Sequence, residues 1–168
     1  IPRGMALGIT MTLPEKDHLT MRKDQLLDQI TMTLGGRVAE EIVYGPDAIT
    51  TGASNDLEKV SATARKMVTA YGMSEKLGNM AYGKSQEHVF MGRDFGHSRD
   101  YSEEIASDID KEVKRIVDEC YTNAKNLLEQ NRDMLEYISR MLLEQETLDE
   151  KDFANYMDKI LAERGNQQ

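Results

Sequence analysis

The sequence predicts a mainly α fold, a helical bundle-like domain with one small β element near its N-terminus. Apolar residues recur at helical spacing along most of the 168 residues, and only 3 prolines are present to interrupt helices. Hydrophobic residues make up 39% and charged residues 30% of the chain, which is typical of a soluble, helix-rich protein. We expect one domain over residues 1–165 and a frayed tail over residues 166–168.

The β element and the first helix occupy the first quarter of the chain. Residues 5–13 are expected to form a short strand that ends at Pro14, and Thr20 is expected to cap the next helix. Apolar residues at every fourth position then form one helical stripe: Leu26, Ile30, Leu34, Val38 and Ile42. Gly45-Pro46 is a stop signal for this helix.

A second helix is expected to open at Asn55, with Glu58 as its capping-box partner, and to end at Gly72. Its predicted apolar face consists of Leu57, Val60, Ala64, Met67, Val68 and Tyr71. Residues 73–100 have no helical period and contain four glycines, so they predict loops or a short hairpin.

Three more helices are expected in the acidic C-terminal part, over residues 102–130, residues 133–145 and a last segment capped by Thr147 and Glu150. The residues predicted to face inward are Ile105, Ile109, Val113, Ile116, Cys120, Ala124 and Leu128, then Leu135, Ile138, Met141 and Leu142, and finally Phe153, Tyr156, Met157, Ile160 and Leu161.

Composition excludes several classes of function. The net charge of −9 argues against nucleic acid and against anionic membrane surfaces as partners. No window holds 18 uninterrupted apolar residues, so these residues predict no transmembrane helix. The single cysteine, Cys120, excludes an internal disulfide and is expected to be buried and unreactive. Because the chain begins with Ile and an apolar run typical of the middle of a fold, we expect it to be part of a longer protein.

The pair Gly35-Gly36 lies within the first predicted helix, where each glycine costs about 1 kcal/mol relative to alanine. One explanation is a small helix face, bearing Gly36, Ala39, Glu40 and Val43, that another backbone could approach closely. The other is a kink, or a helix that ends and restarts. The residues alone favour neither.

Two carboxylates are candidates for a site. Glu40 lies on the small face, and the simpler interpretation is a solvated surface group unless another helix covers that face. Asp56 lies in the first turn of the second helix, where it suits the helix dipole or, alternatively, a metal ion, because the dipole keeps its carboxylate ionised. His18, His88 and His97 fall in predicted loops without HExxH spacing, so exposed loop residues are expected.

Several runs, in order, resemble the peptidase domain of FtsH-type ATP-dependent zinc metalloproteases. They are PRGMALG (2–8), GGRVAEEIVYG (35–45), TGASNDL (51–57), MVTAYGMSEKLG (67–78) and FMGR (90–93). The resemblance implies a mainly helical peptidase domain in a membrane-anchored homo-hexamer that uses ATP and Mg in a separate ATPase module to feed protein substrates to zinc. It also implies a bacterial inner membrane location with the domain in the cytoplasm, or an organelle membrane.

By the same resemblance, Asp56 matches the third zinc ligand and Glu40 a carboxylate that orients a zinc-ligand histidine. Residues 5–13 match an edge strand that could pair with an extended substrate. The HExxH segment, with two histidine ligands and the general-base glutamate, is not found in these residues. We therefore expect this chain alone to be inactive, and its small face to be exposed or covered by another chain.

Two other interpretations stay open at this point. The chain could serve as a metal-free helical scaffold that assembles a protease ring, which an HExxH motif upstream would argue against. An unrelated acidic helical adaptor would require the ordered motifs to be accidental.

Overall fold

The computed structural model describes residues 20–83 and 101–165. The helices are α1 (Lys23–Tyr44), α2 (Ser54–Thr69), α3 (Glu103–Gln130), α4 (Arg132–Gln145) and α5 (Glu150–Gly165), with short 3₁₀ turns η1 (Pro46–Ala48) and η2 (Thr51–Ala53). The mainly α prediction is confirmed. The predicted strand, the tail, and His18, His88 and His97 lie outside the described residues.

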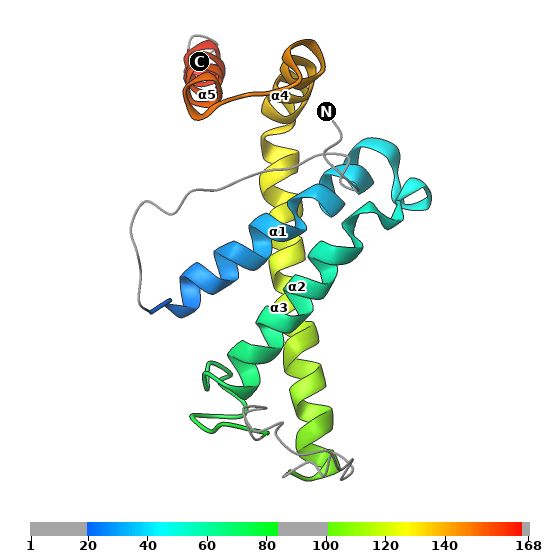
Figure 1. The fold of residues 1–168 in the computed structure, drawn as a ribbon, viewed down its shortest axis with the longest axis vertical. Coiled ribbons are helices and arrows are strands. Elements are labelled where there is room, and N and C mark those ends of the chain that lie inside the picture. The colour runs from blue at the N-terminus through cyan, green and yellow to red at the C-terminus, as the bar shows by residue number, and fades with distance from the viewer. Residues whose placement is uncertain (1–19, 84–100, 166–168) are drawn as a thin grey trace, which may run out of the picture. The chain divides into compact units, whose positions relative to one another are not determined.

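The described residues fall into two compact units, residues 20–126 and residues 127–165, and each is treated by itself. In the first unit α1 and α2 run antiparallel side by side, and α3 crosses them (Figure 1). None of the helices described here combines the length and the apolar run that a bilayer crossing requires. The buried hydrophobic residues of this unit come from all three helices and one loop: Leu26, Ile30, Leu34, Val38, Val60, Ala64, Met67, Val68, Leu77, Ile109, Ile116, Cys120 and Ala124.

The predicted stripes agree well with this core, whereas the predicted start signals do not. Helix α1 begins after Arg22 rather than Thr20, and the backbone N–H of Arg22 donates to the side chain of Gln25 at 2.9 Å. Helix α1 ends at Gly45 as predicted, with φ at +88°, a conformation that glycine adopts without strain. Helix α2 begins directly after η2 with Ala53 at its N-cap, so the expected box of Asn55 and Glu58 is wrong. The side-chain cap lies one turn earlier, where the Thr50 hydroxyl accepts from the N–H of Gly52 at the start of η2.

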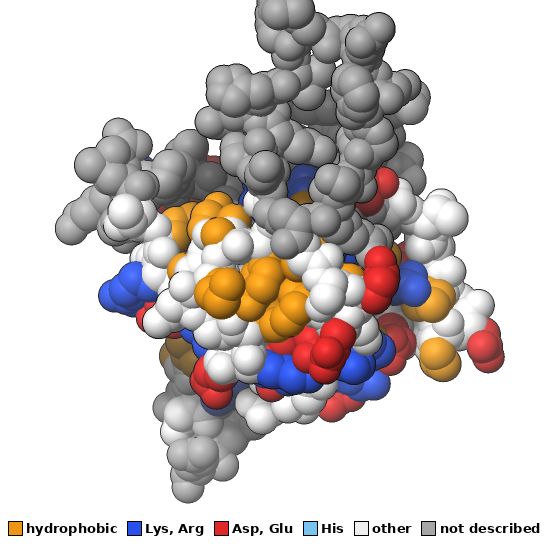
Figure 2. Space-filling view, turned by 90° about the horizontal axis from the view of Figure 1, so that it is seen from below, with side chains coloured by type: hydrophobic (Ala, Val, Ile, Leu, Met, Phe, Trp, Pro, Cys, Tyr) orange, Lys and Arg blue, Asp and Glu red, His pale blue; other side chains and the backbone are white. Residues whose placement is uncertain are grey.

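The described loop between α2 and α3, residues 70–83, contains neither helix nor strand, as predicted. It turns at Gly72, where φ is +60° and an added Cβ would lie 3.2 Å from Asn79 Cα. Tyr71, predicted to be buried, is instead exposed because α2 ends at Thr69. Figure 2 views the end of the unit where this loop lies, and shows hydrophobic side chains gathered at the centre of the described surface with charged groups around them.

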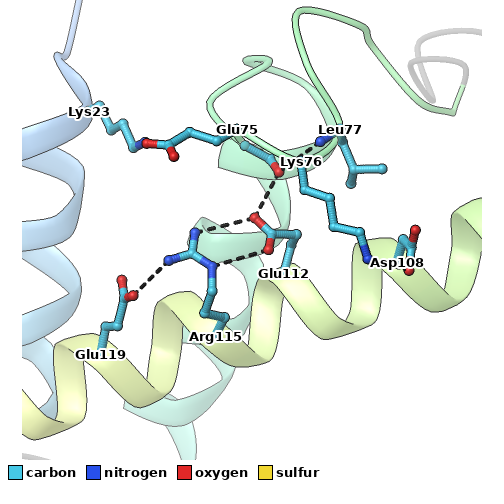
Figure 3. A network of polar contacts seen from close by, with 9 residues as sticks. Lys23, Glu75, Lys76, Leu77, Asp108, Glu112, Arg115 and Glu119 are labelled. Carbon is cyan, nitrogen blue, oxygen red and sulfur yellow. Dashed lines mark hydrogen bonds and ion pairs between the residues drawn. The ribbon is translucent and has the colours of Figure 1, made fainter.

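A buried carboxylate fastens this loop to α3 (Figure 3). Glu112 is only 7% exposed and accepts from the hydroxyl of Ser74 at 2.8 Å. The guanidinium of Arg115 donates to both oxygens of Glu112, at 3.1 and 3.2 Å. These Arg115 bonds, more than the Ser74 bond, hold the pKa of Glu112 below its ordinary value, against the effect of burial. A second tie joins Lys76 to Asp108 at 2.8 Å.

Replacing Glu112 with glutamine is expected to reduce the pH dependence of stability in acid. Because folding lowers the pKa of Glu112, its contribution is fully present above the ordinary value near 4.5 and is lost as the pH falls through the folded-state pKa. Glu112→Gln should lower the free energy of unfolding at pH 7 by about 1.5–3 kcal/mol, the range for charged hydrogen bonds. Urea unfolding between pH 3 and 7 measures this. Equal acid sensitivity in the variant and the wild type would contradict it.

The second unit is a helical hairpin of α4 and α5. Met134 and Ile160 are buried, and Tyr137 packs edge-on against Tyr156 with ring centroids 5.6 Å apart. Asp149 caps α5 by accepting from the N–H of Asp152 at 2.8 Å, so the predicted Thr147–Glu150 box is wrong. Some other residues predicted to face inward are exposed: Leu142, Phe153 and Leu161. A helical stripe predicts which residues share a face, but it does not predict what covers that face.

Candidate metal-ligand site

Asp56 lies in the first turn of α2, as the sequence predicted. Its side chain is 46% exposed, and one carboxylate oxygen lies 3.2 Å from Lys59 Nζ, one turn along the same helix. This position lies at the positive end of the helix dipole, which interacts favourably with a negative side chain. Asp56 is thus an accessible carboxylate whose backbone position is set by the helix that carries it.

Glu40 is not a freely solvated group. Its two carboxylate oxygens accept from the backbone N–H of Thr50 at 3.1 Å and from the Thr50 hydroxyl at 2.7 Å. The guanidinium of Arg37, one turn earlier on α1, donates to the Thr50 carbonyl at 3.2 Å and lies 3.6 Å from Glu40. The bonds from Thr50 lower the pKa of Glu40. The structure therefore connects Glu40 to the segment that leads into the helix of Asp56.

Sequence reasoning singled out Glu40 and Asp56 but missed Arg37 and Thr50. The spacing of Arg37 and Glu40, three residues apart on one helix, was available as a signal. Glu40 and Arg37 lie 10 and 13 residues before Thr50, on the other side of a bend in the chain, and no helical period predicts contacts of this kind.

The neighbouring Glu41 has a different role. It accepts from the hydroxyl of Tyr121 and from Lys125 Nζ at 3.1 Å, both on α3. Burial, together with the bond to Glu41, raises the pKa of Tyr121 to about 12, so the phenol stays protonated and keeps donating at neutral pH. Two adjacent glutamates on α1 thus reach different partners, Glu40 the α1–α2 connection and Glu41 the third helix.

The described residues leave the small face of α1 open around Gly36 and Val43, although Glu40 on the same face contacts Thr50. Helix α1 runs without interruption through Gly35 and Gly36, so the alternative that it ends and restarts there is wrong. Gly36 is exposed, Val43 is 45% exposed, and no described atom lies within 4 Å of a Cβ built at either glycine. This agrees with the expectation that the later helices of the chain do not bury this face.

Replacing Gly36 with alanine is expected to stabilise this chain. Alanine costs about 1 kcal/mol less than glycine in a helix interior, and the new methyl group meets no described atom. Thermal unfolding should show a higher midpoint. If another helix packs on this face in a longer protein, the same change should there lower peptidase activity, with Gly165→Ala at the end of α5 as control. A destabilised Gly36→Ala variant of this chain would contradict the open face.

The side chains available as metal ligands limit which metal sites the described residues can form. No group of three His, Cys, Asp or Glu side chains in residues 20–83 and 101–165 could bind a metal ion. Asp56 fits one ligand position, whereas a catalytic zinc site takes about three protein ligands. Cys120 is buried, as predicted, its thiol donates to the Leu27 carbonyl at 3.6 Å, and burial raises its pKa, which suits neither a ligand nor a nucleophile.

Comparison with known proteins identifies the family. The model of peptidase family M41 matches residues 1–156. The ATP-dependent zinc metalloprotease FtsH 1 of Thermoanaerobacter sp. (strain X514) is 51% identical over 91% of this chain and 25% of its own length. The FtsH protease of Rubrobacter xylanophilus is 54% identical over 89% of this chain and 23% of its own length.

The FtsH protease of Bacillus subtilis (strain 168) is 48% identical over 94% of this chain and 25% of its own length. The chain therefore spans about a quarter of the length of these relatives. The match extends across both units, which confirms the resemblance inferred from the ordered motifs. The chain belongs to peptidase family M41.

Proposed function

We propose that this chain forms the greater part of the peptidase domain of an ATP-dependent zinc metalloendopeptidase, with Asp56 as one zinc ligand. The observation that carries this proposal is the placement of Asp56, an accessible carboxylate in the first turn of a helix whose entry is tied to α1 through Glu40. The relatives described above are all named ATP-dependent zinc metalloproteases, which supports the same reaction.

In this proposal two histidine ligands and a general-base glutamate come from an HExxH helix outside these residues, and this chain alone is inactive. When bound, zinc supplies Lewis-acid chemistry that activates water and polarises the scissile carbonyl. Asp56 holds the metal through a carboxylate oxygen, and Glu40 keeps the α2 entry in place and orients a histidine ligand. The open face around Gly36 is where the HExxH helix packs.

The wider setting is also proposed from the family. The complete protein is a membrane-anchored homo-hexamer that degrades unfolded or regulatory proteins, and ATP with Mg acts in a separate ATPase module. We place it at a bacterial inner membrane with this domain in the cytoplasm, an organelle membrane being the alternative. The metal-free scaffold is the competing proposal.

Zinc stoichiometry tests the proposal directly. The 168-residue chain is compared with a longer version that includes the upstream HExxH helix, by metal analysis after dialysis and by cleavage of an unfolded protein. We expect close to one zinc per chain and proteolysis only in the longer version. Tight stoichiometric zinc in the short chain would overturn the ligand assignment and direct attention to His18, His88 and His97. A longer version with neither zinc nor activity would favour the scaffold.

A further inference from the structure

We infer that Thr50 and Arg37 are positioning residues for the zinc ligand, and that they fix Asp56 by anchoring the entry of α2 to α1. This inference rests on the proposed function, since it concerns the ligand role of Asp56. We call the set of Arg37, Glu40 and Thr50 the entry clamp. Neither Arg37 nor Thr50 contacts Asp56, so both act through the backbone between them.

The entry clamp uses every polar group of Thr50. Its N–H and hydroxyl donate to the two oxygens of Glu40, its carbonyl accepts from Arg37, and its hydroxyl also accepts from the N–H of Gly52 at 3.2 Å. The side chains of Arg37 and Glu40 are each 21% exposed, whereas Thr50 is exposed, so water reaches these bonds from the side of Thr50. Hydrogen bonds to a charged group are about twice as strong as neutral ones, and the 2.7 Å bond from the hydroxyl is of this kind.

A continuous helical run connects Thr50 to Asp56, so the position of Thr50 affects the position of Asp56. Turn η2 begins at Thr51, immediately after the clamp, and the N–H of Ser54 donates to the Thr51 carbonyl where α2 starts. Asp56 is the third residue of α2. Since no loop separates Thr50 from Asp56, a shift of Thr50 moves the carboxylate.

Burial shows why the anchor is needed. The first buried residue of α2 is Val60, which follows Asp56 by four residues. From Thr51 to Lys59 every residue is exposed or half-buried, so hydrophobic packing does not hold the first turn. The entry clamp on one side and Val60 on the other are therefore the two fixed points that bracket the ligand. Without the clamp, the first turn of α2 would open like a helix end.

The main test uses Thr50→Val, which keeps the shape of the side chain and removes its hydroxyl. Thr50→Ser keeps the hydroxyl and serves as the rescue variant. The matched control is Thr122→Val on α3, whose hydroxyl donates to the Asp118 carbonyl in an exposed turn of the same unit. In the 168-residue chain, hydrogen exchange of amides 51–56 should be about tenfold faster in Thr50→Val than in the other two.

The second measurement is metal affinity in the longer version that carries the HExxH helix. We expect Thr50→Val to weaken zinc binding roughly tenfold in competition with a chelator, as for other residues that orient a ligand. We also expect it to change the visible spectrum of the cobalt-substituted protein. Thr50→Ser should restore both, and Thr122→Val should match the wild type. Should Thr50→Val fail to fold, Arg37→Gln removes the guanidinium that donates to the Thr50 carbonyl and must give the same loss.

Asp56→Ala in the same protein separates the two proposals. If it binds zinc as tightly as the wild type, the proposed ligand is wrong. If it loses zinc while Thr50→Val and Arg37→Gln bind zinc with wild-type affinity and spectrum, Asp56 is a ligand and the positioning inference is overturned. Faster exchange at residues 51–56 with unchanged zinc affinity also overturns it, because the clamp would then only stabilise the fold.

Discussion

Replacing Asp56 with alanine is expected to abolish zinc binding and proteolysis in a version of the protein that carries the HExxH helix. A catalytic zinc takes about three protein ligands, so the loss of Asp56 leaves one coordination position without its protein ligand. Among residues 20–83 and 101–165, no group of three potential ligands could hold the ion instead. The loss of affinity should exceed roughly 100-fold, the upper range for residues that only orient a ligand. Chelator competition and a protein cleavage assay measure it.

The control for this experiment is Asp47→Ala in η1, which removes the same charge from an exposed position nine residues earlier. We expect it to bind zinc and cleave as the wild type does. Folding provides the second control. The dipole and the exposed pair with Lys59 contribute no more than about 1 kcal/mol each, so Asp56→Ala should keep nearly the wild-type unfolding midpoint in this chain. Zinc affinity within a few-fold of the wild type would reject Asp56 as a ligand.

The largest effect on stability is expected from Ile30→Ala in α1. Ile30 is 1% exposed, on the stripe of α1 that forms the core of the first unit. Truncation removes apolar contacts and leaves a cavity, which together cost about 2–5 kcal/mol. Because domains are stable by only about 5–15 kcal/mol, this is a large fraction of the whole. Urea unfolding followed by circular dichroism should show a markedly lower midpoint.

Met32→Ala is the matched control, because Met32 lies on the same helix and is 58% exposed. Its truncation should change the free energy of unfolding by no more than about 0.5 kcal/mol. Similar losses from Ile30→Ala and Met32→Ala would mean that the α1 stripe does not face the core as described. A wild-type free energy of unfolding for Ile30→Ala would lead to the same conclusion about the α1 stripe.

Several features of the fold could be predicted because they repeat. Four of the five stripe residues of α1 are buried, and Gly45 ends the helix with positive φ. The predicted caps failed at Thr20, Asn55 and Thr147, because a cap depends on local backbone geometry that several nearby polar residues can satisfy. The C-terminal hairpin exposes Phe153 and Leu161, because a helical period indicates which residues share a face but not whether another element covers it.

The sequence by itself determined the mainly α class, the helix stripes, the family through its ordered motifs, and the two carboxylates to examine. The tertiary structure decided what those carboxylates touch. Glu40 and Arg37 meet Thr50 only because η1 and η2 fold the chain back onto α1, and Glu112 becomes a buried anchor only because the loop after α2 places Ser74 against α3. Such contacts join residues 10 to 38 positions apart. These contacts depend on how the helices pack and on how the connections between them turn. Helix packing and turns leave no repeating pattern in a single sequence, so the contacts could not be predicted from it.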